Sequence, residues 1–260
     1  MTTPTLLAER RGAVLRLTLN RPDKLNAIDV VLLDALTEAL ERAERDAEVR
    51  AIVLAGAGSS FCAGADIGQM IERTPDDWER TVDHYLDPIR AIARMGKPVI
   101  ARLHGNVFGG GLGLAIACDF RVAAQSARMC APFVKLALAG CDMSAGYFLP
   151  RLIGLGRATD MMMTARVVDA TEAQAIGLVS QTVADDQLDA AVDALADKLA
   201  AFAPRTTAFT KGAIRRSLDR DMDGEFDYEI FAQVQCLQSA DHREGVAAFR
   251  ERRAPVFRGV

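Results

Sequence analysis

The sequence has little of what marks nucleic-acid-binding, membrane-spanning, metal-binding or disulfide-linked proteins. Its formal net charge of −4 gives no general attraction to nucleic acid or to an anionic membrane. No apolar run reaches the roughly 18 residues of a membrane-spanning helix, and the N-terminus lacks a signal-peptide core. The five cysteines form no C-x-x-C pair and the three histidines are scattered, so neither a disulfide framework nor a metal site is predicted. We expect a cytoplasmic protein with reduced thiols, a small ligand, and no nucleic-acid or membrane partner.

The apolar residues are arranged as alternating strands and helices. Half of the residues are hydrophobic and a quarter are charged, as in a globular protein with a large core. Strands are predicted at 13–19, 51–56 and 97–105, with an amphipathic helix between the first two. Later segments are mostly helical. We therefore expect an α/β core over residues 1–195 and a C-terminal helical region over 196–260.

Two helix starts nearer the C-terminus are predicted from capping patterns. Thr171 precedes Gln174 by three residues, and Asp241 precedes Glu244 by three, so each pair fits a capping box. Thr171 and Asp241 are therefore expected at the N-caps of two helices.

Four glycines in five residues, from Gly109 to Gly113, follow the predicted strand at 97–105. Glycine bares the backbone at a cost in backbone entropy, which indicates that something approaches this backbone closely. The segment fits neither G-x-x-x-x-G-K-[ST] nor G-x-G-x-x-G, because Leu114 stands three residues after Gly111. This spacing disfavours a Rossmann-type dehydrogenase. Tight packing of a helix on a sheet is an alternative explanation for the glycines.

A second loop of small residues, FCAGAD at 61–66, also follows a predicted buried strand. Two loops at the carboxyl ends of strands could each direct one backbone N–H at the same oxygen. Such a pair of donors forms an oxyanion hole, and loss of one donor typically slows an enzyme ~100 to 1,000-fold. No side chain is needed, which suits a loop of glycines.

Four segments resemble the successive signature segments of the crotonase superfamily, the enoyl-CoA hydratases and isomerases. They are NRPDKLNAID, GAGSSFCAGADI, KPVIARLHGNVFGGGLGLAIACD and SADHREGVAAFRERRAPVF, in the family's order. The resemblance implies a crotonase-like α/β fold, a spiral of repeated ββα units with a C-terminal helical region. It also implies a homotrimer or a dimer of trimers and an acyl-CoA thioester substrate, with coenzyme A as part of that substrate and no separate cofactor.

The resemblance also implies the residues of the site. The backbone N–H groups of Ala65 and Gly110 would bind the thioester oxygen and stabilise the enolate that develops from it. Coenzyme A would contact two loops and the C-terminal tail, the latter from the same or a neighbouring subunit. These contacts would come from Lys24, Leu25, Ala63, Asp66, Ile67, Phe249 and Arg252. Arg252 could instead be a solvated charge on an amphipathic helix, without any contact with coenzyme A.

The sequence departs from the hydratases of the family at two positions. Their catalytic glutamates stand two residues after the glycine triplet and directly after a proline in the next loop, and here these positions hold Gly113 and Phe133. Neither residue can transfer a proton. Asp142 lies nine residues beyond Phe133, where isomerases of the family carry an aspartate about eight residues beyond. One such carboxylate could move a proton between two carbons, although an Asx turn or a helix cap is the alternative for Asp142.

We therefore predict double-bond isomerisation or a related enolate reaction. A hydratase with atypical catalytic groups and a non-catalytic acyl-CoA-binding protein are the alternatives, since both are compatible with the two replaced glutamates. His104, at the end of a predicted strand, is expected to be a hydrogen-bonded structural residue. The identity of the acyl chain does not follow from the sequence.

Overall fold

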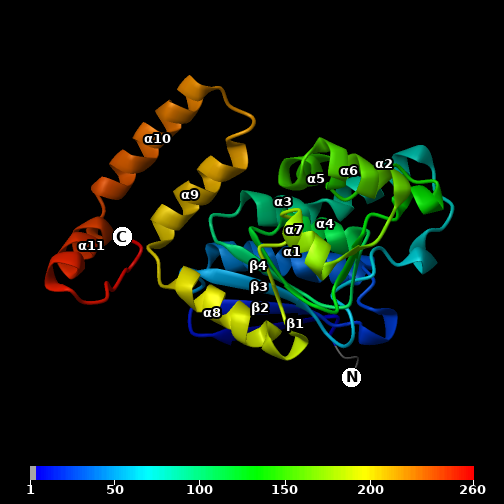
Figure 1. The fold of residues 1–260 in the computed structure, drawn as a ribbon, viewed down its shortest axis with the longest axis horizontal. Coiled ribbons are helices and arrows are strands. Elements are labelled where there is room, and N and C mark those ends of the chain that lie inside the picture. Colours follow the sequence, from blue (N-terminus) through cyan, green and yellow to red (C-terminus); the bar gives the residue numbers. More distant parts are fainter. Residues whose placement is uncertain (1–3) are drawn as a thin grey trace.

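A six-stranded sheet forms the centre of the N-terminal part of the structure, a computed structural model that describes residues 4–260 (Figure 1). The strand order is β1-β2-β3-β4-β6-β9, in which β1 and β2 pair antiparallel and all other neighbours pair parallel. The strands are β1 (Leu6–Arg11), β2 (Val14–Leu19), β3 (Ala51–Gly56), β4 (Val99–Leu103), β6 (Phe120–Ala124) and β9 (Gln181–Val183). Because β3 is buried along its whole length, its sequence AIVLAG shows no alternation of apolar and polar residues.

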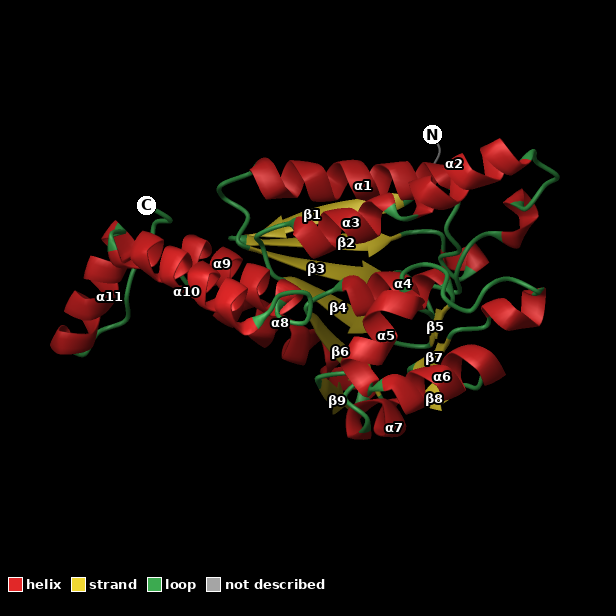
Figure 2. Cartoon of the chain, turned by 90° about the horizontal axis from the view of Figure 1, so that it is seen from above, coloured by secondary structure: helices red, strands yellow, loops and turns green. Residues whose placement is uncertain are grey.

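Helices cover both faces of this sheet (Figures 1 and 2). They are α1 (Val30–Arg45), α3 (Asp87–Arg94) and α4 (Gly110–Ala117) on one face and α8 (Leu188–Ala200) on the other. Leu17 and Leu19 of β2 pack in the cluster that contains α1, whereas Val14 of the same strand packs with α8. Alternate side chains of one strand thus enter two separate cores, and the predicted α/β class is confirmed.

A second, smaller sheet follows β4 along the chain. Its order is β5-β7-β8, with β5 parallel to β7 and β7 antiparallel to β8. These strands are β5 (Asn106–Phe108), β7 (Arg128–Cys130) and β8 (Val168–Asp169). Since β5 leads directly into α4, the glycine-rich segment lies at the exit of the small sheet.

The connecting segments contain short helices and 3-10 turns. They are α2 (Pro75–Tyr85), α5 (Ala145–Ile153), α6 (Leu155–Thr164), α7 (Ala170–Ala175), η1 (Pro22–Lys24), η2 (Ile67–Gln69), η3 (Phe133–Leu136) and η4 (Asp185–Gln187). Within residues 4–260, no helix combines the length and the apolarity needed to cross a membrane.

Three C-terminal helices extend away from the core (Figure 1). They are α9 (Pro204–Arg216), α10 (Met222–Leu237) and α11 (Ala240–Glu251). Lys211 of α9 is buried, and its Nζ donates to the carbonyl oxygens of Ile92 at 2.9 Å and Lys97 at 2.8 Å. The same Nζ lies 2.8 Å from Asp119 Oδ2. Burial lowers the pKa of Lys211 in spite of this ion pair, and the three contacts anchor α9 to the core.

Both capping predictions are wrong. α7 begins after Asp169 rather than Thr171, and α11 begins after Ser239 rather than Asp241. The side chains of Asp169 and Ser239 accept backbone N–H bonds from the first turns, and both residues have the extended backbone that an N-cap requires. The Asp241 carboxylate instead accepts the backbone N–H of Arg258 at 2.7 Å, which ties the C-terminal segment to α11.

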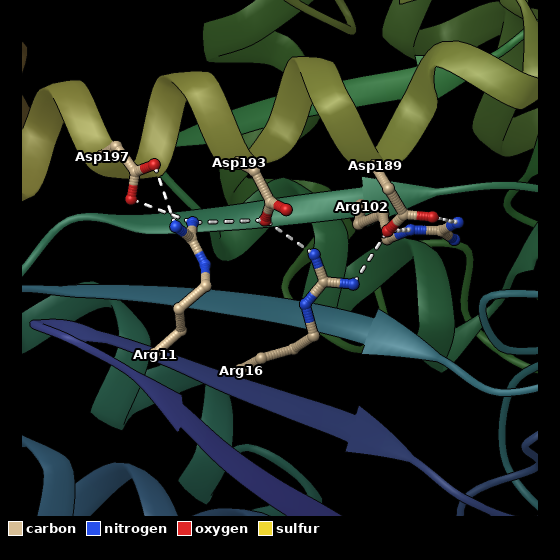
Figure 3. Close-up of polar contacts among 6 residues, drawn as sticks. All are labelled: Arg11, Arg16, Arg102, Asp189, Asp193 and Asp197. Atoms are coloured by element: carbon tan, nitrogen blue, oxygen red, sulfur yellow. Dashed lines mark hydrogen bonds and ion pairs between the residues drawn. The ribbon is translucent and has the colours of Figure 1, made fainter.

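A row of ion pairs joins α8 to the sheet (Figure 3). The residues are Arg11, Arg16 and Arg102 on the strands and Asp189, Asp193 and Asp197 on α8. Arg102 binds both oxygens of Asp189, with Nε 2.8 Å from Oδ1 and Nη2 2.7 Å from Oδ2. Arg16 Nη1 donates to the same carboxylate at 2.8 Å. The hydrogen bonds from Arg102 and Arg16 outweigh partial burial and hold the pKa of Asp189 well below its usual range.

Asp189→Asn should lower the free energy of unfolding by about 1 kcal/mol at low ionic strength, because two arginines lose their carboxylate partner. The Asp189 side chain is 55% exposed, so molar salt should shrink this difference. Because the folded-state pKa is lowered, the contribution is complete above pH ~4 and is lost as the pH falls toward the folded-state value. Urea unfolding of the wild type and the variant at several pH values measures this difference in the free energy of unfolding.

The matched control is Asp186→Asn, because Asp186 forms no ion pair within the described part of the chain. An equal loss of stability in the control, or a loss at Asp189 that does not change with salt, would contradict the assigned role.

Candidate active site

Two loops are joined by backbone hydrogen bonds beyond the carboxyl ends of β3 and β4. The segment 61–66 runs parallel to the segment 104–108, and the two form a bridge at Cys62. The Cys62 N–H donates to the Asn106 carbonyl at 3.0 Å, and the Phe108 N–H donates to the Cys62 carbonyl at 2.9 Å. The predicted oxyanion loop and the strand that leads into the glycine tract are therefore held edge to edge.

A third segment binds the other side of the 61–66 loop. The Ile28 N–H donates to the Gly64 carbonyl at 2.8 Å, and the Asp66 N–H donates to the Ile28 carbonyl at 2.9 Å. The Ala63 N–H donates to the Leu25 carbonyl at 3.0 Å. We call the hydrogen-bonded set formed by 25–28, 61–66 and 104–108 the backbone seam. In its parallel bridge with Ile28, Ala65 directs its own N–H away from Ile28.

The seam brings the backbone N–H groups of Ala65 and Gly110 close together. A Cβ atom placed on Gly110 would lie 3.6 Å from Ala65 N, and one placed on Gly64 would lie 3.5 Å from Gly110 N. Within residues 4–260, neither N–H donates to a protein acceptor. Gly110 is the first residue of α4, so its N–H has no partner inside the helix and lies at the positive end of the helix dipole. Two such donors can bind one oxygen.

The glycines of the tract have two different functions. Gly109 has a φ of +53°, a conformation that favours glycine and turns the chain from β5 into α4. Gly110 contributes bare backbone. A Cβ on Gly111 or on Gly113 would lie 2.4 Å from a backbone oxygen, so these two positions need glycine for close packing. Bare backbone for a ligand therefore explains Gly110, whereas tight packing explains Gly111 and Gly113.

Met143 occupies the space that a side chain at position 113 would need. A Cβ on Gly113 would lie 2.4 Å from the Met143 carbonyl oxygen and 2.7 Å from Met143 Cβ. The Met143 side chain is buried, and its Cε lies 3.3 Å from the position of a Cβ on Gly110. Ile28 Cδ1 lies 3.2 Å from that same position. Two apolar side chains therefore border the pair of N–H donors.

Phe133 adds a third apolar group near the donors. Its ring is buried, and its Cε1 lies 3.8 Å from the position of a Cβ on Gly109. Neither position 113 nor position 133 carries a group that could move a proton. Two other candidates are also inert: burial raises the pKa of Cys62 to about 12, and the His104 ring is hydrogen-bonded to Gly58 and Arg102, as predicted.

Asp142 lies beside this site in the loop formed by residues 137–144. It directly precedes Met143, and its side chain is half-buried. Its Oδ1 accepts the N–H of the next residue, Met143, at 2.7 Å. An Asx turn would use the N–H two residues on, and the N-cap of α5 is Ser144, so Asp142 forms neither of the structural alternatives. Its Oδ2 has no hydrogen-bond partner in the part of the chain that the structure describes.

The residues expected to contact coenzyme A fall into two groups. Lys24, Leu25, Ala63, Asp66 and Ile67 lie in the backbone seam or next to it. Phe249 and Arg252 lie at the far end of the molecule, on or directly after α11 (Figures 1 and 2). The Phe249 side chain is 85% exposed. A single chain therefore does not bring the tail residues to the pair of N–H donors.

Arg21 links two loops of the site and was not predicted from the sequence. Its guanidinium lies 3.1 Å from Asp29 Oδ2 and 3.0 Å from Asp66 Oδ2, and it also donates to the Ala27 carbonyl. The hydrogen bond from Arg21 lowers the pKa of Asp66. Asp66 directly follows Ala65, so this ion-pair cluster fixes the loop that carries the first N–H donor. No spacing in the sequence links these residues.

A large cavity lies away from these residues. Its volume is about 1140 Å³, and it is enclosed by α9, α10 and α11 on one side and by the end of α4, β6 and α5 on the other. Lys211, Arg215 and Phe249 are among its lining residues, whereas Ala65, Gly110 and Asp142 are not. We therefore place the candidate site at the pair of N–H donors rather than in this cavity.

A family model described as "Enoyl-CoA hydratase/isomerase" matches residues 9–260. The chain belongs to this family. It is 38% identical over 264 residues to a probable enoyl-CoA hydratase of Mycobacterium tuberculosis, covering 97% of this chain and 92% of that protein. It is 34% identical over 261 residues to the 1,2-epoxyphenylacetyl-CoA isomerase of Escherichia coli, covering 98% of each chain.

Solved structures of the family have the same fold. An enoyl-CoA hydratase from Bacillus anthracis matches with a TM-score of 0.94 at 31% identity, covering 98% of this chain and all of that chain. This match confirms the predicted crotonase-like α/β fold with C-terminal helices. Membership of the enoyl-CoA hydratase/isomerase family also confirms the predicted class of acyl-CoA enzyme.

Gly113→Ala should lower the free energy of unfolding by roughly 1–3 kcal/mol, because the new methyl group would overlap the backbone of Met143. Gly156→Ala is the matched control, since Gly156 lies in α6 and nothing is within 4 Å of its Cβ position. We expect the control to be neutral or slightly stabilising. Denaturant unfolding compares the two, and an unchanged stability of Gly113→Ala would show that the 137–144 loop moves aside readily.

Proposed function

We propose that this enzyme shifts the double bond of an enoyl-CoA thioester, with Ala65 and Gly110 as the oxyanion hole and Asp142 as the proton carrier. One observation carries the proposal: two unpartnered N–H donors lie next to each other, beside the loop that contains Asp142. The Met143 N–H holds one carboxylate oxygen of Asp142, which leaves the other oxygen available for a proton.

The proposed reaction needs only these groups. The thioester oxygen accepts hydrogen bonds from Ala65 and Gly110, and the Asp142 carboxylate removes a proton from C2 of a 3-enoyl-CoA. The electron pair of that C–H bond forms the C1–C2 double bond, and negative charge moves onto the bound oxygen. Return of the charge forms the C2–C3 double bond, while the electrons of the former C3–C4 double bond take the proton from Asp142 at C4. One carboxylate thus carries one proton between two carbons.

Replacement of the two hydratase glutamates favours this reaction over hydration. Gly113 and Phe133 leave no second acid or base to activate water by the usual two-glutamate mechanism. Overall identity does not distinguish reaction types, because a short-chain-enoyl-CoA hydratase of Clostridium acetobutylicum and the 1,2-epoxyphenylacetyl-CoA isomerase of Escherichia coli are each 34% identical to this chain. The distinction therefore depends on the residues at the site.

The C-terminal tail supports the proposal of a homotrimer or a dimer of trimers. α9 and α10 expose a series of large apolar side chains that one chain leaves uncovered: Ile214, Met222, Phe226, Ile230, Phe231, Val234 and Leu237. A neighbouring subunit that covers them would also bring Phe249 and Arg252 within reach of coenzyme A on another chain. Lys24, Leu25, Ala63, Asp66 and Ile67 would then supply the remaining coenzyme A contacts.

Asp142→Asn should reduce the turnover of a 3-enoyl-CoA by about 10² to 10⁴-fold, since the amide cannot carry the proton. Binding of butyryl-CoA, measured by calorimetry, should change little. Asp76→Asn, at an exposed position on α2, is the control. Unchanged turnover would remove Asp142 from the mechanism, and tight binding by the wild type without any turnover would favour the non-catalytic alternative.

Ile230→Asp should break the assembly, because a charge in the centre of the apolar face of α10 would lose its hydration on burial. Sedimentation velocity should give a multiple of three chains for the wild type and a smaller species for the variant. Val31→Asp places the same charge at an exposed apolar position on α1 and should leave the assembly intact. A monomeric wild type would contradict the proposed trimer.

A further inference from the structure

We propose that Met143 determines which reaction this site performs, by excluding water from the acyl carbons next to the oxyanion hole. The inference rests on the proposed enolate chemistry of Ala65, Gly110 and Asp142. It adds a specificity-determining residue that has no acid or base function of its own.

The Met143 side chain lies along the first turn of α4. Its Cβ is 2.7 Å from the position of a Cβ on Gly113, and its Cε is 3.3 Å from that on Gly110. Positions 110 and 113 are three residues apart and therefore share one face of the helix. The N–H donor of Gly110 lies at the N-terminal end of that face. The thioether thus extends from the place of the missing glutamate to the edge of the oxyanion hole.

The loop holds Met143 in this position by contacts of its own. Met143 and Ser144 both have the left-handed backbone that L-residues adopt rarely, with φ values of +49° and +66°. The Asp142 carboxylate accepts the Met143 N–H, and the Asp142 carbonyl accepts the Ala145 N–H at 3.0 Å. Two consecutive residues in this conformation persist only where the surrounding structure fixes them. Because the loop is fixed in this way, Met143 stays in the space next to Gly113, and a side chain at position 113 would overlap it.

This position decides whether water can reach the acyl chain. Hydration places a water oxygen on C3 and a proton on C2, whereas the double-bond shift needs no water. A thioether and the neighbouring Ile28 offer almost no hydrogen bonds, so a water molecule there would lack the partners that an ordered buried water needs. The neighbours of Met143 in the chain are polar: Asp142, and Ser144, whose Oγ is buried without a partner within residues 4–260. A shortened side chain would therefore open space for water beside a carboxylate.

Met143→Ala and Met143→Val test the proposal, with Met143→Leu as the control of similar volume. Each variant is given a 3-enoyl-CoA and crotonyl-CoA in isotopically labelled water, and the 2-enoyl and 3-hydroxyacyl products are quantified by mass spectrometry. We expect the ratio of hydration to isomerisation to rise about tenfold or more in the shortened variants and to stay at the wild-type value in Met143→Leu. Combining Met143→Ala with Asp142→Asn should abolish the gained hydration.

Binding of butyryl-CoA and a thermal unfolding transition establish that each variant is folded, and the smaller change in Met143→Val covers a failure of Met143→Ala to fold. Folded variants with an unchanged product ratio would overturn the role of Met143 while leaving the isomerase proposal intact. A wild type that isomerises nothing would overturn the proposed function. Even then, crotonyl-CoA hydration still tests Met143: a gain in the shortened variants supports the proposal, and no gain overturns it.

Discussion

The backbone seam is the constraint on which the rest of the site depends. It joins three segments that are distant in sequence through hydrogen bonds between main-chain atoms. Close approaches between the seam and the residues next to it require glycine: a Cβ on Gly105 would lie 2.0 Å from the Ser59 carbonyl oxygen, and one on Gly56 would lie 2.3 Å from that of Phe61. Ala65 and Gly110 belong to different loops, so only this edge-to-edge pairing places their N–H groups together.

Around the seam, side chains adjust a geometry that the backbone has already determined. Arg21 ties Asp66 to Asp29 and so fixes one end of the 61–66 loop. On the opposite face of the sheet, α8 is held both by an apolar core and by paired charges. The site is therefore formed where apolar packing, main-chain hydrogen bonds and a few partly buried ion pairs meet at the carboxyl ends of the strands, the usual position of ligands in α/β sheets.

Local patterns in the sequence predicted much of the fold and the position of the N–H donors. β3 follows from a run of apolar β-formers, and the glycine tract predicted bare backbone at Gly110. The predicted helix caps were wrong because a capping pattern can occur by chance. The residue that caps the helix is the one whose backbone is extended at the helix start. For α7, the N-cap is Asp169, two residues before the predicted Thr171.

Contacts between distant segments left no pattern in the sequence. The position of Met143 depends on the path of the 137–144 loop, and the partners of Arg21 lie on two different loops. The expected roles of Phe249 and Arg252 depend on a neighbouring chain, because α11 lies far from the N–H donors of its own chain. Asp142 could be located near the site, but its local hydrogen bond to Met143 became apparent only in the structure.

Met143 occupies the space that a side chain at position 113 would need, and this limits how the sequence can change. A glutamate at position 113 and the present course of the 137–144 loop are mutually exclusive, because each occupies the space of the other. A single substitution of Gly113 by glutamate in a chain with this loop would produce a strained protein. The loop and the glycine must change together, so at least two coupled changes separate this chain from a two-glutamate hydratase.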